Sequence, residues 1–234
     1  NNTNIESITI PGSVKEIGES AFSSCKNLKK VILNEGLEKI GDYAFNNTNI
    51  ESITIPNSVK EIGERAFFGC KNLKEVILNE GLEKIGAKAF YHTSIESITI
   101  PGSVKEIGVE AFDFSIISYI SINSNNKNFE IKDNFFIDKN NKKILAYLDK
   151  EATKVTIPDS VKEIGDYSFY GCKNLKEVFL NEGLEEIGAR AFKYTKIESI
   201  TIPDSVKEIG KGAFSNCKNL KEVILNEGLE RIGW

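Results

Sequence analysis

Cysteine is the most prominent reactive side chain in this sequence of 234 residues, which contains four of them. In an extracellular protein, four cysteines would normally predict two disulfides. All four stand at the same place of an internal repeat, and the nearest two are separated by two repeat units, roughly 9–10 Å if the units stack like strands. Because a disulfide requires Cα atoms within about 7 Å, we expect buried free thiols at Cys25, Cys70, Cys172 and Cys217.

Other groups able to catalyse a reaction or bind a metal are sparse. His92 is the one histidine, which excludes a His-rich metal site, and its place at a turn between repeat units predicts a surface residue. Residues 133–141 loosely resemble a calcium loop but lack the glycine and the bidentate glutamate of an EF-hand. The irregular region 113–151 contains Asp133, Asp138 and Asp149 without an obvious base. We therefore predict that the protein is not an enzyme and has no catalytic residue, metal or cofactor.

The composition is that of a soluble folded protein, with 40% hydrophobic and 27% charged residues. The formal net charge is −4, so no strongly basic field favours nucleic-acid phosphates. Uninterrupted apolar runs are only a few residues long, which predicts no membrane insertion. The sequence does not begin with Met and shows no signal peptide, so we interpret it as a fragment of a longer protein.

Internal repeats organise the whole chain. The heptapeptide Ile-Glu-Ser-Ile-Thr-Ile-Pro occurs at 5–11, 50–56, 95–101 and 197–203, and a weaker copy lies at 152–158. The 45 residues from one copy to the next divide again into two units of 22–23 residues, which have the same apolar positions and which we call A and B. A units begin at residues 5, 50, 95, 152 and 197, B units begin at 28, 73, 175 and 220, and 117–151 is an irregular unit with an insertion. Such units bury their apolar faces only by stacking.

The repeat resembles a known family. Its L-x-x-V-x-L core (Leu28, Val31, Leu33) is similar to leucine-rich repeats, and P-x-S-V-K-E-I-G-x-x-A-F-x-x-C-x-N-L resembles the BspA-like subclass of bacterial and protist surface proteins. The resemblance implies a mostly β fold: a single right-handed leucine-rich-repeat solenoid over 1–234, with about ten coils, short parallel strands, few or no long helices and one β-hairpin insertion. It also implies an extracellular or cell-surface location.

Local patterns agree with stacked coils. Alternation in 7–10 and 30–33 predicts a short strand, followed by a second one that ends at a glycine, where we expect a positive φ or a tight backbone approach. Eight phenylalanines, Phe22 through Phe214, recur at one position and should stack inside. At the second, eleventh and twelfth positions of the units, lysine and glutamate alternate from coil to coil, as in Lys15 and Glu38, with exceptions at the twelfth position in the later units. We expect these charge ladders to help select which unit neighbours which, although a merely solvated surface is the alternative.

The insertion reads as a β-hairpin, with strands at 135–138 and 142–147 around the turn 139–141. Neither end of the sequence carries a polar capping unit, and solenoids need caps for solubility. We therefore expect that uncapped ends could stack end to end on other molecules.

A binding face follows from the outward side of the main strands. A units place small polar residues there, such as Ser7 and Thr9, whereas B units place a large apolar residue. A spaced row of exposed apolar side chains is a candidate protein-binding face, bordered in our interpretation by the aromatic residues of the hairpin. Two alternatives to a binding role remain. The apolar residues could be present because β-branched side chains suit any strand, exposed or not, or the side chains of neighbouring strands could cover them. The candidate residues are Ile32, Ile77, Phe179, Ile224, Phe135, Phe136 and Tyr147.

The resemblance implies a non-catalytic adhesin-type module that binds a protein ligand, such as a host extracellular-matrix protein or another cell-surface protein. The competing hypothesis is a rigid spacer or stalk that presents another domain, which the near-identity of the repeats favours. The fold alone does not decide between them.

Overall fold

The structure is a computed structural model that describes residues 3–114 and 116–233. The chain divides into two compact units, residues 1–127 and 128–234. The division falls inside the irregular unit 117–151, where the sequence repeat is interrupted. Each unit is a mostly β stack of coils, with about ten turns in all and no helix among the described residues. A single continuous solenoid over 1–234 stays a prediction.

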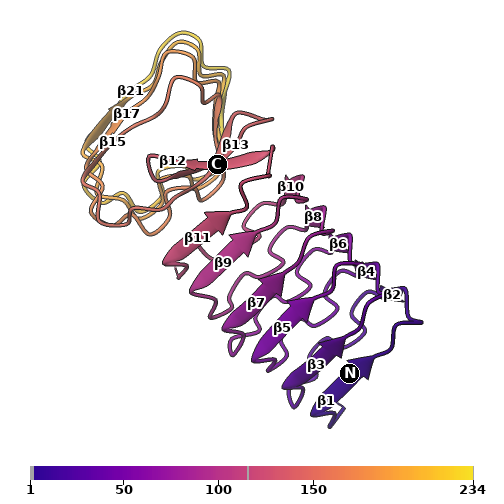
Figure 1. The fold of residues 1–234 in the computed structure, drawn as a ribbon. Coiled ribbons are helices and arrows are strands. Elements are labelled where there is room, and N and C mark those ends of the chain that lie inside the picture. The colour runs from indigo at the N-terminus through magenta and orange to yellow at the C-terminus, as the bar shows by residue number, and fades with distance from the viewer. Residues whose placement is uncertain (1–2, 115, 234) are drawn as a thin grey trace. The chain divides into compact units, whose positions relative to one another are not determined.

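The first unit consists of two rows of parallel strands (Figure 1); each of its first five coils contributes one strand to each row, and the coil of β11 contributes a long strand alone. In the row of long strands, β1 pairs with β3, β5 with β7 and β9 with β11, each in register over four residues. The long strands are β1 Ser7–Ile10, β3 Lys30–Leu33, β5 Ser52–Ile55, β7 Glu75–Leu78, β9 Ser97–Ile100 and β11 Tyr119–Ile122. The short strands are β2 Glu16–Ile17, β4 Lys39–Ile40, β6 Glu61–Ile62, β8 Lys84–Ile85 and β10 Glu106–Ile107.

The second unit begins with an antiparallel meander, β12 Phe129–Lys132, β13 Phe135–Asp138 and β14 Lys143–Tyr147. Strand β14 then pairs in parallel with the row of short strands, so the hairpin is joined to the solenoid by backbone hydrogen bonds. That row contains β16 Glu163–Ile164, β18 Glu186–Ile187, β20 Glu208–Ile209 and β22 Arg231–Ile232. The long strands are β15 Lys154–Thr156, β17 Glu177–Phe179, β19 Ser199–Thr201 and β21 Glu222–Ile224.

The core is a ladder of identical contacts repeated from coil to coil. In β5 and β7 the inward residues are buried and the outward ones exposed, as the alternation predicts. The predicted phenylalanine stack is confirmed: ring centroids of neighbouring coils lie 5.2–5.5 Å apart from Phe22 to Phe112. In the second unit the stack runs through Phe169, Phe192 and Phe214. Flat aromatic pairs at this spacing add dispersion to the burial of each ring.

The glycine that follows the short strand is required by close packing in every coil except the first, where a Cβ on Gly18 would meet nothing within 4 Å. A Cβ built on Gly86 would lie 2.5 Å from the carbonyl carbon of Gly63 and 2.6 Å from the nitrogen of Glu64. The positive φ occurs two residues later instead, for example at Tyr43 and Arg65. Of the two expectations for this glycine, the tight approach is therefore confirmed.

The hairpin exists as predicted, but its aromatic side chains are core residues. Phe135, Phe136 and Tyr147 are 3%, 0% and 5% exposed, so the expectation that they border a binding face is wrong. Tyr147 extends the phenylalanine stack, with its ring 5.3 Å from that of Phe169. The hairpin residues Phe135, Ile137, Ile144 and Tyr147 thus belong to the same hydrophobic core as the coils of the second unit.

Candidate functional site

The outward face of the long strands carries the predicted apolar residues in exposed positions. Ile32 is 42% exposed, and Ile77, Phe179 and Ile224 are each 45% exposed. Backbone register places Thr9 beside Ile32 and Thr54 beside Ile77. The face therefore alternates between small hydroxyl side chains and large apolar ones, and the latter are not covered by the neighbouring ladders.

A groove borders Ile77 on this face of the first unit. It has a volume of about 290 Å³, and its lining includes Glu75, Ile77, Thr99 and Tyr119. Strand register places Tyr119 directly beside Ser97, and Tyr119 is 64% exposed. The sequence analysis missed this tyrosine, although an aromatic residue at a position where A units carry serine was a readable signal.

A second groove borders Phe179 in the second unit, with a volume of about 400 Å³. Its lining includes Glu177, Phe179, Thr201 and Asn226. The ammonium group of Lys154 lies 4.4 Å from the centre of the Phe179 ring, a cation–π contact that covers part of one ring face. Both units thus combine one exposed apolar wall with hydroxyl groups from the adjacent A strand, which can bind a partner by apolar contact and hydrogen bonds.

The turns at the end of this face are held by two different polar networks. In the first unit, a B-unit glutamate accepts hydrogen bonds from the next coil: Glu35 from the backbone N–H groups of Asn57 and Ser58, and Glu80 from those of Gly102 and Ser103. Hydrogen bonding, led by the N–H of Asn57, lowers the pKa of Glu35, and the N–H of Gly102 does the same for the pKa of Glu80.

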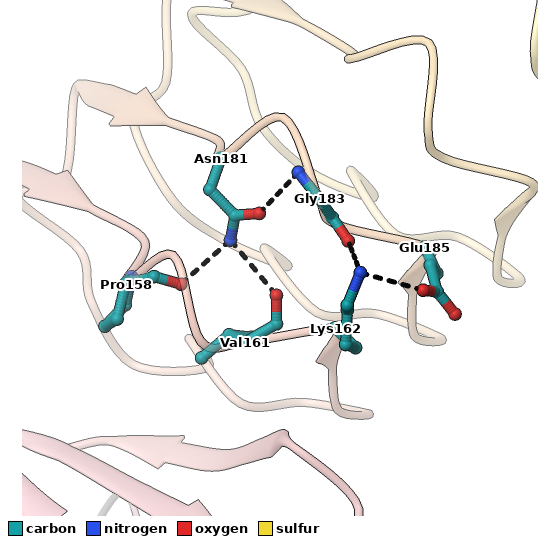
Figure 2. A network of polar contacts seen from close by, with 6 residues as sticks. All are labelled: Pro158, Val161, Lys162, Asn181, Gly183 and Glu185. Atoms are coloured by element: carbon teal, nitrogen blue, oxygen red, sulfur yellow. Dashed lines mark hydrogen bonds and ion pairs between the residues drawn. The ribbon is translucent and has the colours of Figure 1, made fainter.

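In the second unit an asparagine holds the turn (Figure 2), as Asn126 does at the last turn of the first unit, where it donates to the carbonyl oxygens of Pro101 and Val104. The side-chain amide of Asn181 donates hydrogen bonds to the carbonyl oxygens of Pro158 and Val161, and its oxygen accepts one from the N–H of Gly183. The ammonium group of Lys162 donates to the carbonyl oxygen of Gly183 and forms an ion pair with Glu185. The sequence explains the change. The A-unit residue at this turn is Asn57 or Gly102 in the first unit but Asp204 in the second, and a glutamate cap would meet its like charge.

The predicted charge ladders form at two of the three positions. Lys15–Glu38 at 3.1 Å, Lys105–Glu83 at 2.7 Å and Lys162–Glu185 at 3.0 Å join neighbouring coils at the eleventh position. At the twelfth position, Lys39 lies between Glu16 and Glu61. The charges at the second position, such as Glu6 and Lys29, extend into solvent and make no ion pair among the described residues.

One ladder in the second unit departs from alternation. Glu163, Glu186 and Glu208 are neighbours in register, and the row ends on Lys143 at one side and Arg231 at the other. Burial, and then repulsion by the two flanking glutamates, raises the pKa of Glu186. The charged form of Glu186 therefore costs stability at a pH above its raised pKa.

The cysteines are free and buried, as predicted. The thiol of Cys70 lies 3.2 Å from the hydroxyl of Thr48 and 3.1 Å from the carbonyl oxygen of Phe45, and burial raises the pKa of Cys70. Cys172 differs because the ammonium group of Lys150 stands where other coils place threonine, 3.9 Å from the sulfur. These thiols support the packing of the corner and are not accessible to a substrate.

The remaining polar candidates have structural contacts. Asp138 accepts hydrogen bonds from the N–H groups of Asn140 and Asn141, which shapes the hairpin turn. His92 is exposed, as predicted, and its Nδ1 lies 3.8 Å from a carboxylate oxygen of Asp113. Within the described part of the chain, no three His, Cys, Asp or Glu side chains are grouped to hold a metal ion. Nor does that part contain a helix long and apolar enough to cross a bilayer.

Stacked coils of 22–23 residues, each with a long strand, a short strand and an inward phenylalanine, define a solenoid of the leucine-rich-repeat type. The family model for the BspA type leucine rich repeat region matches residues 1–117, 38–147 and 143–234. The chain therefore belongs to the BspA-type leucine-rich repeat family, and the resemblance inferred from the sequence is confirmed. A search of curated proteins finds no match.

Solved bacterial structures share this fold. The chain is 34% identical to the pneumococcal vaccine antigen PcpA, with a TM-score of 0.86 over 97% of this chain and 58% of that one. It is 30% identical to a leucine-rich repeat protein from Eubacterium ventriosum ATCC 27560, with a TM-score of 0.81 over 96% of this chain and 61% of that one. A leucine rich cell surface protein from Faecalibacterium prausnitzii A2-165, at 23% identity and a TM-score of 0.61 over 95% and 79% of the two chains, shares the fold. The chain thus spans less than two thirds of the first two proteins.

Proposed function

We propose that this chain is a non-catalytic, adhesin-type module of a surface or secreted protein, and that it binds a protein partner through the outward face of its long strands. The observation that supports this proposal is the exposure of large apolar side chains beside threonine on the long strands of each unit, Ile32 and Ile77 in the first and Phe179 and Ile224 in the second. Large apolar side chains at regular exposed positions are typical of interaction surfaces. The similarity to a vaccine antigen supports an extracellular location.

The test replaces Ile32, Ile77, Phe179 and Ile224 by threonine, the residue of the A units. The core is untouched and threonine suits strands, so the variant should keep its far-UV circular dichroism spectrum. Binding of the wild type and the variant is measured on immobilised fibronectin, laminin and collagen. Loss of the four apolar contacts should weaken binding about tenfold or more, since tenfold is about 1.4 kcal/mol and truncating one central hot-spot residue costs about 2 kcal/mol or more.

Val109 is the matched control, because it is 42% exposed but lies in a turn outside this face. The Val109→Thr variant should bind as the wild type does. Unchanged binding by the folded quadruple variant would place recognition elsewhere. If the wild-type protein binds none of the matrix proteins, the rigid-spacer hypothesis becomes the better description.

A further inference from the structure

A third groove lies at a different place, the corner that precedes the long strands of the second unit. It has a volume of about 500 Å³ and spans three successive coils. Its lining includes Tyr170, Tyr194, Lys173, Lys196, Lys218 and Asn219. The three lysines are exposed and stand at the same position of consecutive coils, so their backbones are spaced by about 4.8 Å.

The lysine ladder departs from the repeat. In the first unit the corresponding B-unit residues are Asn49 and Ser94, whose side chains donate to the carbonyl oxygens of Lys26 and Lys71 in the preceding coil. Lys196 replaces this residue in the second unit and forgoes that contact. A lysine at this position removes the side-chain hydrogen bond to the preceding coil and places like charges side by side, so it does not benefit the fold. Departures of this kind from the repeat are expected at functional sites.

The charges of this ladder are available to a ligand. Lys173, Lys196 and Lys218 form no ion pair with any described residue. Glu151 borders the ladder on the side of the irregular coil, where it accepts a hydrogen bond from the side chain of Asn174. Three adjacent ammonium groups therefore face solvent and favour a polyanion.

Tyr194 is a second departure from the repeat. Its φ is +66°, a conformation that glycine and asparagine adopt at lower cost than a bulky residue. Most other coils place serine, asparagine or glycine at this position, and one places His92, also with a positive φ; the residues are Ser24, Asn47, Gly69, His92, Gly171 and Asn216. Tyr194 is 44% exposed, and its ring centroid lies 5.8 Å from that of Tyr170. The ammonium group of Lys193 lies over the Tyr194 ring. A strained aromatic residue at the edge of a groove points to a ligand.

We propose that this corner binds a linear acidic polysaccharide, with sulfate or carboxylate groups on the lysine ladder and a sugar ring packed against Tyr194. Aromatic faces suit the apolar C–H face of a sugar, and the amide of Asn219 can bind hydroxyl groups. An extended acidic peptide fits less well, because its same-face side chains repeat every 6.6–6.8 Å, roughly, rather than at the coil spacing. This inference does not rest on the proposed function, since the groove shares none of the four outward apolar residues.

The probe is a fluorescent heparin decasaccharide, whose binding to the full chain is followed by anisotropy. Three lysine contacts predict that the logarithm of affinity falls with the logarithm of salt concentration with a slope of about −2 to −3. Lys196→Ser, which copies Ser94, should weaken binding about two- to fivefold, the range of one exposed charge pair. Tyr194→Asn, which copies Asn47 and keeps the positive φ, should weaken binding by about as much.

Lys71→Ser is the matched control, because Lys71 occupies the same position in the first unit between Asn49 and Ser94. It should leave the affinity unchanged. The proposal is overturned if Lys71→Ser weakens binding as much as Lys196→Ser, if fully desulfated heparin binds equally well, or if the decasaccharide does not bind. Tighter binding of poly-glutamate than of heparin would assign the groove to an acidic peptide and would also overturn it.

Discussion

Gly18 and Gly86 occupy the same repeat position but have different surroundings, which allows a matched test of the backbone packing. A Cβ on Gly86 would come within 2.5–2.7 Å of the backbone of Gly63 and Glu64, whereas a Cβ on Gly18 meets nothing within 4 Å. Neither glycine has a positive φ, so alanine is conformationally acceptable at both. The two substitutions therefore differ in sterics alone.

The expected magnitudes follow from that difference. Gly86→Ala overpacks a backbone contact and should destabilise the fold by about 1–3 kcal/mol or more. Gly18→Ala should be neutral or stabilise by about 0.4–1 kcal/mol through the unfolded state. For a chain of this size each kcal/mol shifts Tm by about 2–4 °C. Thermal unfolding followed by circular dichroism should place the Tm of Gly86→Ala well below that of the wild type and Gly18→Ala at or slightly above it.

The first coil must contribute to the measured transition for this comparison to hold. Ile17 is 3% exposed in that coil, and Ile17→Ala should lower stability by about 2–4 kcal/mol. If Ile17→Ala lowers Tm and Gly18→Ala lowers it as much as Gly86→Ala, close coil packing is not what requires the glycine.

Three further predictions concern charge and thiols. Titration with a thiol reagent should find no reactive cysteine in the native protein and four after unfolding without reductant; a lower final count would mean that a disulfide forms. Glu186→Lys restores the alternation of charge that Lys39 and Lys84 provide in the first unit. Because the pKa of Glu186 is raised, its charged form costs stability above that pKa, and the variant should raise Tm by about 1–3 °C at pH 7. The opposite substitution, Lys84→Glu, is the control and should lower Tm. The lowered pKa of Glu80 stabilises the fold above the unfolded pKa of about 4.3 and is lost as pH falls through the folded value. Glu80→Gln should therefore reduce stability at pH 7 and show a shallower acid decline in pH-dependent unfolding, and an unchanged acid profile would contradict the cap.

The repeat made the coils predictable because each unit must bury the same apolar positions against its neighbours. The paired strands, the phenylalanine stack and the free thiols of Cys25 to Cys217 all follow from one register. The exposure of Ile32 and Phe179 followed from strand alternation alone.

The irregular unit was harder because nothing in its own pattern tells inside from outside. Phe135 and Tyr147 are buried because they pack against Phe169 in the core of the second unit. Strand β12, and the two-residue turn at Asp133 and Asn134 with its positive φ angles, were not anticipated by the sequence analysis. The change of turn network at Asn181 was also missed, because it depends on a charge in the next coil rather than on the local sequence.

The alternation of A and B coils also bears on how such a chain changes length. Deleting residues 50–94 removes one A and one B coil and brings Glu38 beside Lys105, which keeps opposite charges adjacent. Deleting the single coil 28–49 would instead bring Lys15 beside Lys60. Recombination between near-identical coding segments, which are spaced one A–B pair apart, yields the first kind of change. Related genes should therefore differ in length by whole pairs of coils, and an odd coil should appear only with compensating charge changes.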